Sequence, residues 1–139
     1  MYRMCYISTA RQPIDRAICD NILTASRINN ERAGLTGLLI AGRQRFLQAL
    51  EGDEVSVRRA FDRIKRDSRH FGCVLLEQKP VSVRQFPLWS MGFEQSEEGA
   101  GGVSDAQLAA VLIGQIADAN LRAQFEGFLT LQWKGGLAA

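Results

Sequence analysis

The sequence contains few residues that could perform familiar catalytic chemistry. His70 is the only histidine among 139 residues, so a Ser-His-Asp or Cys-His arrangement would have to use it, and it lies in no recognisable local motif. The three cysteines (Cys5, Cys19 and Cys73) show no CxxC spacing and no cluster with histidine, so no metal site is expected. The phosphate-cradling patterns GxGxxG and GxxxxGK[ST] are absent. Triad catalysis, metal sites and the usual phosphate-cradling loops are therefore not expected, and His70 is expected to be structural or on the surface.

Two other polar side chains stand out by their settings. Tyr6 lies in MYRMCYIS, where residues alternate between two faces with the period of two that is typical of a β-strand. Gln48 lies in FLQALEG between apolar neighbours. If its face is buried, its amide needs partners, because an unpaired buried amide costs about 1–3 kcal/mol. Tyr6 by itself is most often an ordinary core tyrosine, whereas Gln48 is more unusual.

Hydrophobic periodicity and turn residues predict the elements that position these side chains. The expected order is a strand over 2–8, a helix from Pro13 to about Ser26, a loop at Asn29, Asn30 and Gly34, strands over 36–41 and 45–50 joined by a hairpin turn at 42–44, a helix capped by Asp53, and strands over 73–76 and 86–93. This β-α-β-β-α-β-β order predicts an α+β fold. Specifically, it predicts a ferredoxin-like sandwich with a five-stranded mixed sheet and two core helices.

A glycine-rich stretch separates this predicted core from the C-terminal part of the chain. Ser104 and Gln107 form a capping box that predicts the start of a third helix, and a fourth helix follows it. The expected organisation is a core over 1–95, a linker over 96–103 and a two-helix extension over 104–139. The extension is unusually apolar, so we expect it to pack on the sheet or on a partner subunit.

Composition limits the broad class of protein. A net charge of +2 does not support a strongly basic nucleic-acid surface. The longest nearly uncharged apolar run, over 108–116, is far shorter than the roughly 20 residues of a membrane span. The N-terminus lacks a secretory pattern, and an odd number of cysteines suits a reducing compartment. We therefore expect a cytoplasmic protein that binds neither nucleic acid nor membrane.

Five segments in register resemble the BLUF domain, a blue-light sensor that uses a flavin. They are MYRMCYIS, SRINNERAGLTGLL, FLQALEG, DRIKRDSRH and FPLWSMGF, and the resemblance covers about residues 1–95. It implies that the flavin lies between the two core helices, that Tyr6 is the redox tyrosine, that Gln48 bridges Tyr6 to the flavin, and that Asn30 holds the isoalloxazine carbonyl edge. The other residues that the resemblance places at the flavin or in the light response are Ser8, Asn29, Arg63, Asp67, Trp89 and Met91.

The residue types suit the implied photochemistry. A phenol such as Tyr6 can release both an electron and a proton, and the amide of Gln48 carries both a donor and an acceptor. The resemblance implies non-covalent FAD, with FMN or riboflavin as possible forms. It also implies a red-shifted signalling state passed through the last strand and the C-terminal helices. With no enzymatic output domain expected, the signal would pass to an unknown partner protein or through self-association, a dimer being the default.

Two alternatives stay open from the sequence. A flavin-dependent redox enzyme of similar fold would need an open substrate face and a bound reductant, and the sequence shows no nicotinamide-binding motif. A light-insensitive protein-interaction module would have no need for the pair of Tyr6 and Gln48.

Overall fold

The computed structural model describes residues 1–14, 16–42, 44–86, 92–95 and 110–138. Its elements in chain order are β1 (Tyr2–Ala10), α1 (Arg16–Ala33), β2 (Thr36–Ala41), β3 (Arg45–Gly52), α2 (Glu54–Lys65), β4 (His70–Pro80), β5 (Gly92–Gln95) and α4 (Ala119–Ala138). A short helical segment over 110–114 precedes α4. The predicted β-α-β-β-α-β-β order and the ferredoxin-like α+β class are confirmed.

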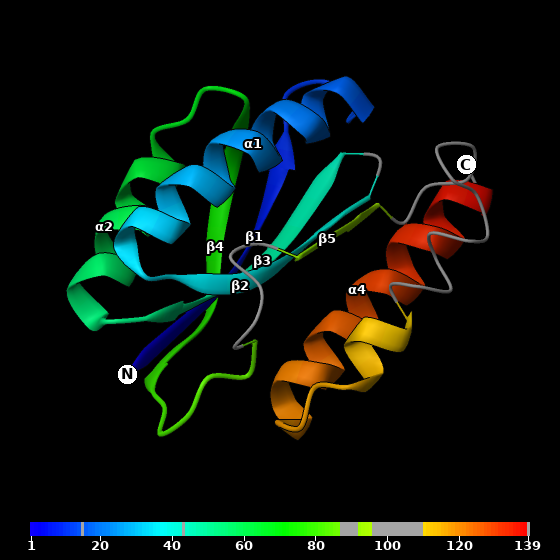
Figure 1. The fold of residues 1–139 in the computed structure, drawn as a ribbon. Coiled ribbons are helices and arrows are strands. Elements are labelled where there is room, and N and C mark those ends of the chain that lie inside the picture. The colour runs from blue at the N-terminus through cyan, green and yellow to red at the C-terminus, as the bar shows by residue number, and fades with distance from the viewer. Residues whose placement is uncertain (15, 43, 87–91, 96–109, 139) are drawn as a thin grey trace.

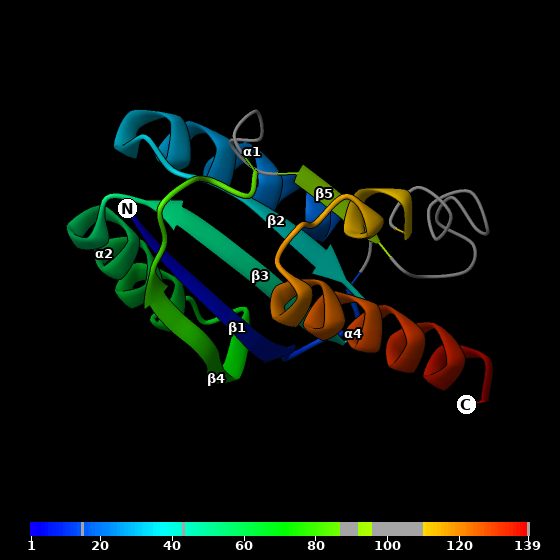
Figure 2. The ribbon, with the colours of Figure 1, turned by 90° about the horizontal axis from the view of Figure 1, so that it is seen from below.

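The strands form one five-stranded mixed sheet in the order β4-β1-β3-β2-β5. The contacts of β1 with β3 and β4, and of β2 with β3, are antiparallel, whereas β5 lies parallel to β2. Helices α1 and α2 cover one face of this sheet and α4 lies on the other (Figures 1 and 2). The central strands β1 and β3 are therefore buried between two layers of helix.

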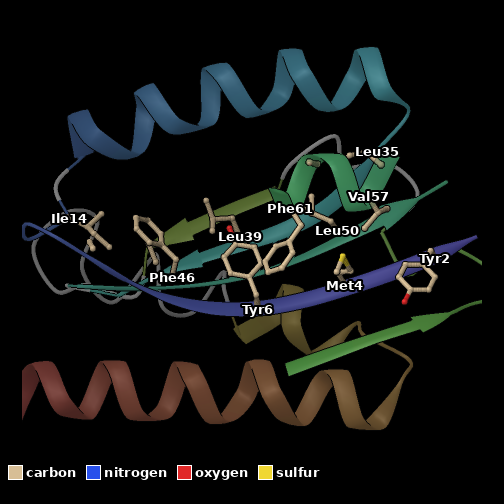
Figure 3. Close-up of a cluster of buried hydrophobic side chains, with 13 residues drawn as sticks. Tyr2, Met4, Tyr6, Ile14, Leu35, Leu39, Phe46, Leu50, Val57 and Phe61 are labelled. Carbon is tan, nitrogen blue, oxygen red and sulfur yellow. The ribbon is translucent and has the colours of Figure 1, made fainter. Parts of the chain in front are cut away.

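Side chains alternate along β1 and therefore contribute to the cores on both faces of the sheet. The β1 residues Tyr2, Met4, Tyr6 and Ala10 join the hydrophobic core beneath α1 and α2 (Figure 3). Cys5, on the opposite face, joins a second core with Leu121 and Phe125 of α4. Cys5 is fully buried, as expected for a core residue. We call these the cleft face and the α4 face of the sheet.

Helix α1 is longer than the sequence suggested, which corrects the predicted loop at Asn29 and Asn30. The helix continues to Ala33, so both asparagines lie within its last two turns. Gly34, at φ 69°, ends it: its N–H donates to Glu31 O, and Leu35 N–H donates to Asn30 O. This pair of bonds is a Schellman motif, in which glycine adopts the left-handed conformation at no steric cost.

The last two strands also differ from their predicted bounds. β4 runs from His70 to Pro80, so Pro80 is the end of an edge strand and not part of a connection. Phe86 lies outside any strand, and β5 begins at Gly92. Residues 87–91, the rest of the predicted strand, lie outside the described residues, as do the 96–103 linker and the predicted helix start at Ser104. The Asp53 cap of α2 is confirmed, since its carboxylate accepts from Ser56 N–H.

An ion-pair cluster joins the α4 face of the sheet to the start of α4. Arg3 on β1 contacts the carboxylates of Glu51 on β3, Glu77 on β4 and Asp118 before α4, at 3.3, 3.2 and 2.8 Å. Glu51 also accepts hydrogen bonds from the backbone N–H groups of Gln85 and Phe86, at 2.7 and 2.9 Å. We call Arg3, Glu51, Glu77 and Asp118 the charged cluster. It fixes three separate chain segments against one strand.

Candidate functional site

The centre of the cleft face is a hydrogen bond between two buried side chains on neighbouring strands. The antiparallel register places Tyr6 of β1 directly opposite Gln48 of β3. The Tyr6 hydroxyl donates to the Gln48 side-chain carbonyl oxygen, Oε1. Tyr6 is 3% and Gln48 4% exposed, so the pair is shielded from bulk water. The Phe61 ring of α2 lies 5.3 Å from the Tyr6 ring and restricts its orientation.

This pair lies at a cleft between the sheet, α1 and the end of α2. Its empty volume, counting the part open to solvent, is about 440 Å³. Its polar lining residues are Tyr6, Ser26, Gln48, Asp67, Arg69 and His70. Its apolar lining residues are Ile22, Leu39, Phe46 and Ile64. We call this space the Tyr6 cleft.

His70 holds one wall of the Tyr6 cleft in place. Its Nε2 lies 2.5 Å from the backbone oxygen of Ile64, and its Nδ1 lies 2.8 Å from the hydroxyl of Ser8. A backbone oxygen only accepts, so Nε2–H donates to it, and in the neutral ring Nδ1 then accepts from Ser8. The Phe46 ring meets the imidazole edge-on at 6.3 Å. His70 is therefore a structural residue that also lines the Tyr6 cleft.

Burial favours the protonated form of the Tyr6 phenol. Loss of solvation raises its pKa above the ordinary value, and the negative charges that Cys73, Cys5 and Asp67 can carry add to the effect. At neutral pH, Tyr6 therefore keeps its proton, held toward Gln48. A reaction that removes an electron from this phenol would make the proton acidic and leave Gln48 as the acceptor already in contact.

The structure brings together only some of the side chains predicted for the site. Tyr6, Gln48 and Asp67 line the cleft, and Ser8 lies behind it, against His70. Asn30 is buried in the last turns of α1, and Asn29 is half-buried beside it, but neither lines the cleft. Arg63 is exposed on α2. Trp89 and Met91 lie outside the described residues.

Several residues that line the cleft were not anticipated. Phe46 and Arg69 carry no local signal, because only the packing of β3 against the connection after α2 brings them to the cleft. Ile22 and Ser26 lie on α1, where the predicted helix did not specify which turn faces the sheet. His70 carried a signal, since a lone buried histidine needs two partners, but its partners are separated from it by 6 and 62 positions.

The lining of the cleft suits a flavin. Apolar side chains from α1, β2, β3 and α2 suit a flat aromatic ring, while Gln48, Asp67 and Ser26 offer hydrogen bonds to its polar edge. Within the described ranges, no group of three or more His, Cys, Asp or Glu side chains could hold a metal ion. None of the helices described combines the length and the apolar character needed to cross a bilayer.

Comparisons with known proteins agree with this geometry. The family model described as "BLUF: Sensors of blue-light using FAD" matches residues 1–92. The photoactivated adenylate cyclase subunit beta of Euglena longa is 28% identical over 89 residues, which are 63% of this chain and 10% of that protein. The chain spans about a tenth of the length of the curated relatives it matches.

Solved structures share the fold. The dark-state structure of BlrB, described as a BLUF protein, has a TM-score of 0.71 at 24% identity and covers 93% of each chain. A bacterial light-regulated adenylyl cyclase has a TM-score of 0.68 at 23% identity, covering 96% of this chain and 40% of the cyclase. At these identities the likeness establishes the fold alone.

Proposed function

This chain belongs to the BLUF family of blue-light sensors that use a flavin, and we propose that it senses light through Tyr6 and Gln48 with FAD bound in the Tyr6 cleft. The observation that carries this proposal is the buried hydrogen bond from Tyr6 to Gln48 at the wall of that cleft. The side chains proposed to hold the flavin are Tyr6, Ser8, Asn29, Asn30, Gln48, Arg63, Asp67 and Met91. The geometry supports Tyr6, Gln48 and Asp67 most directly.

The bound flavin would supply absorption of blue light and, once excited, an oxidant for a nearby phenol. Loss of an electron from Tyr6 makes its hydroxyl proton strongly acidic. Gln48 Oε1 already accepts that hydrogen bond, so the proton has a short path to it. Return of the electron and the proton to Tyr6, together with rotation or tautomerisation of the Gln48 amide, would leave donor and acceptor positions exchanged with no net oxidation of the protein.

We propose that the signal leaves the site through the sheet and reaches a separate partner protein. Two of the relatives named above are adenylate cyclases, whereas this chain would use contacts of its last strand, including Trp89 and Met91, and of the extension over 104–139. β3 supports such a route, since Gln48 faces the cleft while its neighbours Leu47 and Ala49 belong to the α4-face core. A partner reads the switch only if it binds the two states with different affinity.

The proposed organisation is a flavin-binding core over 1–95, a linker over 96–103 and the C-terminal extension. We propose a homodimer in the cytoplasm. Leu131 and Val111 support the dimer, because they leave apolar side chains 72% and 57% exposed. The free Cys5 and Cys73 suit a reducing compartment.

The proposal is tested by visible absorption of purified protein in darkness and directly after blue light. A yellow protein with a reversible red shift is expected. Tyr6→Phe should keep the flavin and lose the shift, because phenylalanine can release neither the electron nor the proton. Tyr2→Phe is the matched control: Tyr2 is also buried on the cleft face of β1, but its hydroxyl contacts Gln78 and Arg58 at 3.4 and 3.0 Å.

Gln48→Ala should likewise retain flavin without the red shift. A normal light response in Tyr6→Phe or Gln48→Ala would remove that residue from the mechanism. Flavin bound by the wild type with no light response would contradict the sensor and favour a redox enzyme. A colourless protein that binds no added flavin would contradict the site itself.

A further inference from the structure

A second cavity adjoins the Tyr6 cleft. It lies between the end of β1 and the connection from α2 to β4, with an empty volume of about 720 Å³ including the part open to solvent. Its lining residues are Ala10, Arg11, Gln12, Phe46, Ser68 and Arg69. Phe46 and Arg69 line both cavities, so the two spaces adjoin. We call this second cavity the arginine pocket.

The chemistry of the arginine pocket suits an anion. Its polar side chains are two guanidinium groups, the amide of Gln12 and the hydroxyl of Ser68, all of which can donate hydrogen bonds. Among the residues that the structure describes, no carboxylate contributes to its lining. The Tyr6 cleft differs, since Asp67 is among its lining residues. Positive charge and donors thus concentrate in the cavity that adjoins the Tyr6 cleft.

Arg11 supplies charge that the described part of the chain does not neutralise. Its guanidinium lies 5.2 Å from the centroid of the Phe71 ring, and no described carboxylate lies within ion-pair distance of it. The stacking keeps the guanidinium on the surface beside the pocket and leaves its edge available for hydrogen bonds. An Arg11 N–H···O bond to the Arg69 backbone, at 3.0 Å, ties the two loops together.

Arg69 is oriented by Asp67, a residue that lines the Tyr6 cleft. Its Nε and Nη2 donate to the Asp67 carboxylate, with Nε at 2.9 and 3.0 Å from the two oxygens. Among the described residues, its Nη1 has no hydrogen-bond partner. Arg69 therefore links a carboxylate at the Tyr6 cleft with donors that remain available to the arginine pocket.

From this arrangement we propose that the arginine pocket binds the phosphate end of the flavin and makes the chain select FMN and FAD over riboflavin. The inference rests on the proposed flavin site, because the ring of the ligand occupies the Tyr6 cleft. The three flavins share that ring and its ribityl chain, and only FMN and FAD carry phosphate. Arginine guanidinium groups bind phosphate oxygens through charge-assisted hydrogen bonds. The phosphate contact is assigned chiefly to Arg11, since Asp67 already neutralises Arg69.

Titration of the flavin-free protein with riboflavin and with FMN, followed by quenching of flavin fluorescence, separates the ring site from the phosphate site. FMN is expected to bind about ten-fold more tightly than riboflavin at low salt. This ratio corresponds to a difference of roughly 1.4 kcal/mol in binding free energy. FAD should share this advantage. The ratio should fall as salt rises, because the pocket is open to solvent and its charge is screened.

Arg11→Gln should bring the ratio of FMN to riboflavin affinity to about two-fold or less while leaving riboflavin affinity unchanged. Unchanged riboflavin binding also shows that the variant is folded. Arg59→Gln is the matched control, since it removes the same charge from an exposed position on α2 that lines neither cavity. It should keep the wild-type ratio.

The outcomes distinguish the two proposals. Equal affinity of the wild type for riboflavin and FMN would overturn the phosphate site and leave the flavin site intact. An FMN preference that persists in Arg11→Gln would also overturn the assignment of the phosphate to this pocket. Failure of every flavin to bind would overturn the proposed function and this inference with it.

Discussion

The two faces of the sheet bury polar groups in opposite ways. On the cleft face, Tyr6 and Gln48 form a neutral hydrogen bond beside empty volume that reaches the surface. On the α4 face, Arg3 and Glu51 form an ion pair that is 2% and 0% exposed and covered by other segments of the chain. The same two strands, β1 and β3, provide both pairs.

The difference teaches which face can respond to a ligand and which holds the fold together. A neutral pair next to a cavity can change partners at low cost, because each hydrogen bond contributes only about 0.5–1.5 kcal/mol net. A buried charge cannot lose its partner cheaply, because it is left in a medium of low dielectric constant. Substitutions on the α4 face should therefore change stability first, and those on the cleft face should change ligand or light response first.

Loss of the Glu51 carboxylate is expected to have the largest effect on stability. Glu51→Ala leaves Arg3 with a weakened set of partners and removes the acceptor of two backbone N–H groups. Removing one partner of a buried ion pair costs about 3–5 kcal/mol. Urea unfolding of wild type and variant, compared at equal m-value, measures this loss.

Two controls accompany the Glu51 substitution. Glu51→Gln keeps an oxygen that can accept from the backbone and should lose less stability than Glu51→Ala. Glu54→Ala breaks an exposed ion pair with Arg58, whose side chain is 48% exposed, and should cost about 0.5 kcal/mol or less. Equal losses for Glu51→Ala and Glu54→Ala would show that the charged cluster does not stabilise the fold.

Truncation of Leu121 is expected to have the next largest effect. Leu121 is fully buried in the α4-face core, and leucine-to-alanine changes in cores cost about 3 kcal/mol. The affinity for flavin should stay within two-fold, since none of the described residues that line the Tyr6 cleft lies on α4. Thermal or urea unfolding and flavin titration measure the two quantities on one preparation.

Leu131→Ala is the control on the same helix. Its side chain is 72% exposed, so the free energy of unfolding should fall by less than about 0.5 kcal/mol.

Leu39→Ala extends the comparison to the cleft face, because Leu39 is buried and lines the Tyr6 cleft. That variant should lose both stability and flavin affinity. A Leu121→Ala protein with full stability would contradict the packing of α4 on the sheet.

The smallest expected effect is the pH dependence contributed by Asp118. The Leu121 backbone N–H, and then Arg3 and Lys79, hold the pKa of its carboxyl well below the ordinary value. Because the folded-state pKa lies below the unfolded value of about 3.9, this charge stabilises the fold above pH 4. The contribution is lost as the pH falls through that value toward the lowered folded-state pKa.

Asp118→Asn isolates this charge, because asparagine can still cap α4. The variant should be less stable than wild type by about 1 kcal/mol or less at pH 6, and the two should converge at the acid end of a series of urea unfolding curves. A constant difference between the two proteins from pH 6 to pH 2 would exclude the carboxylate charge as the cause.

The alternation of side chains between the two faces of a strand could be predicted, because it depends only on residues that are neighbours in the sequence. The alternation along β1 predicted that Tyr6 and Cys5 face opposite sides, and the structure confirms it. The loop predicted at Asn29 and Asn30 was wrong. Asparagine favours a turn only where no stronger helix-ending signal follows, and here a Schellman motif at Gly34 ends α1 four residues after Asn30.

The sequence by itself determined the element order, the two faces of the central strands and, through resemblance, the pair of Tyr6 and Gln48. Only the tertiary structure decided which side chains from distant segments come into contact. The direct pairing of Tyr6 with Gln48 comes from the strand register, and the charged cluster joins Arg3 to Glu51 and Asp118, which lie 48 and 115 positions away. Backbone periodicity acts over a few residues and leaves a trace in the sequence. Contacts between distant segments arise when packing removes water from all of them together, so no local pattern records them.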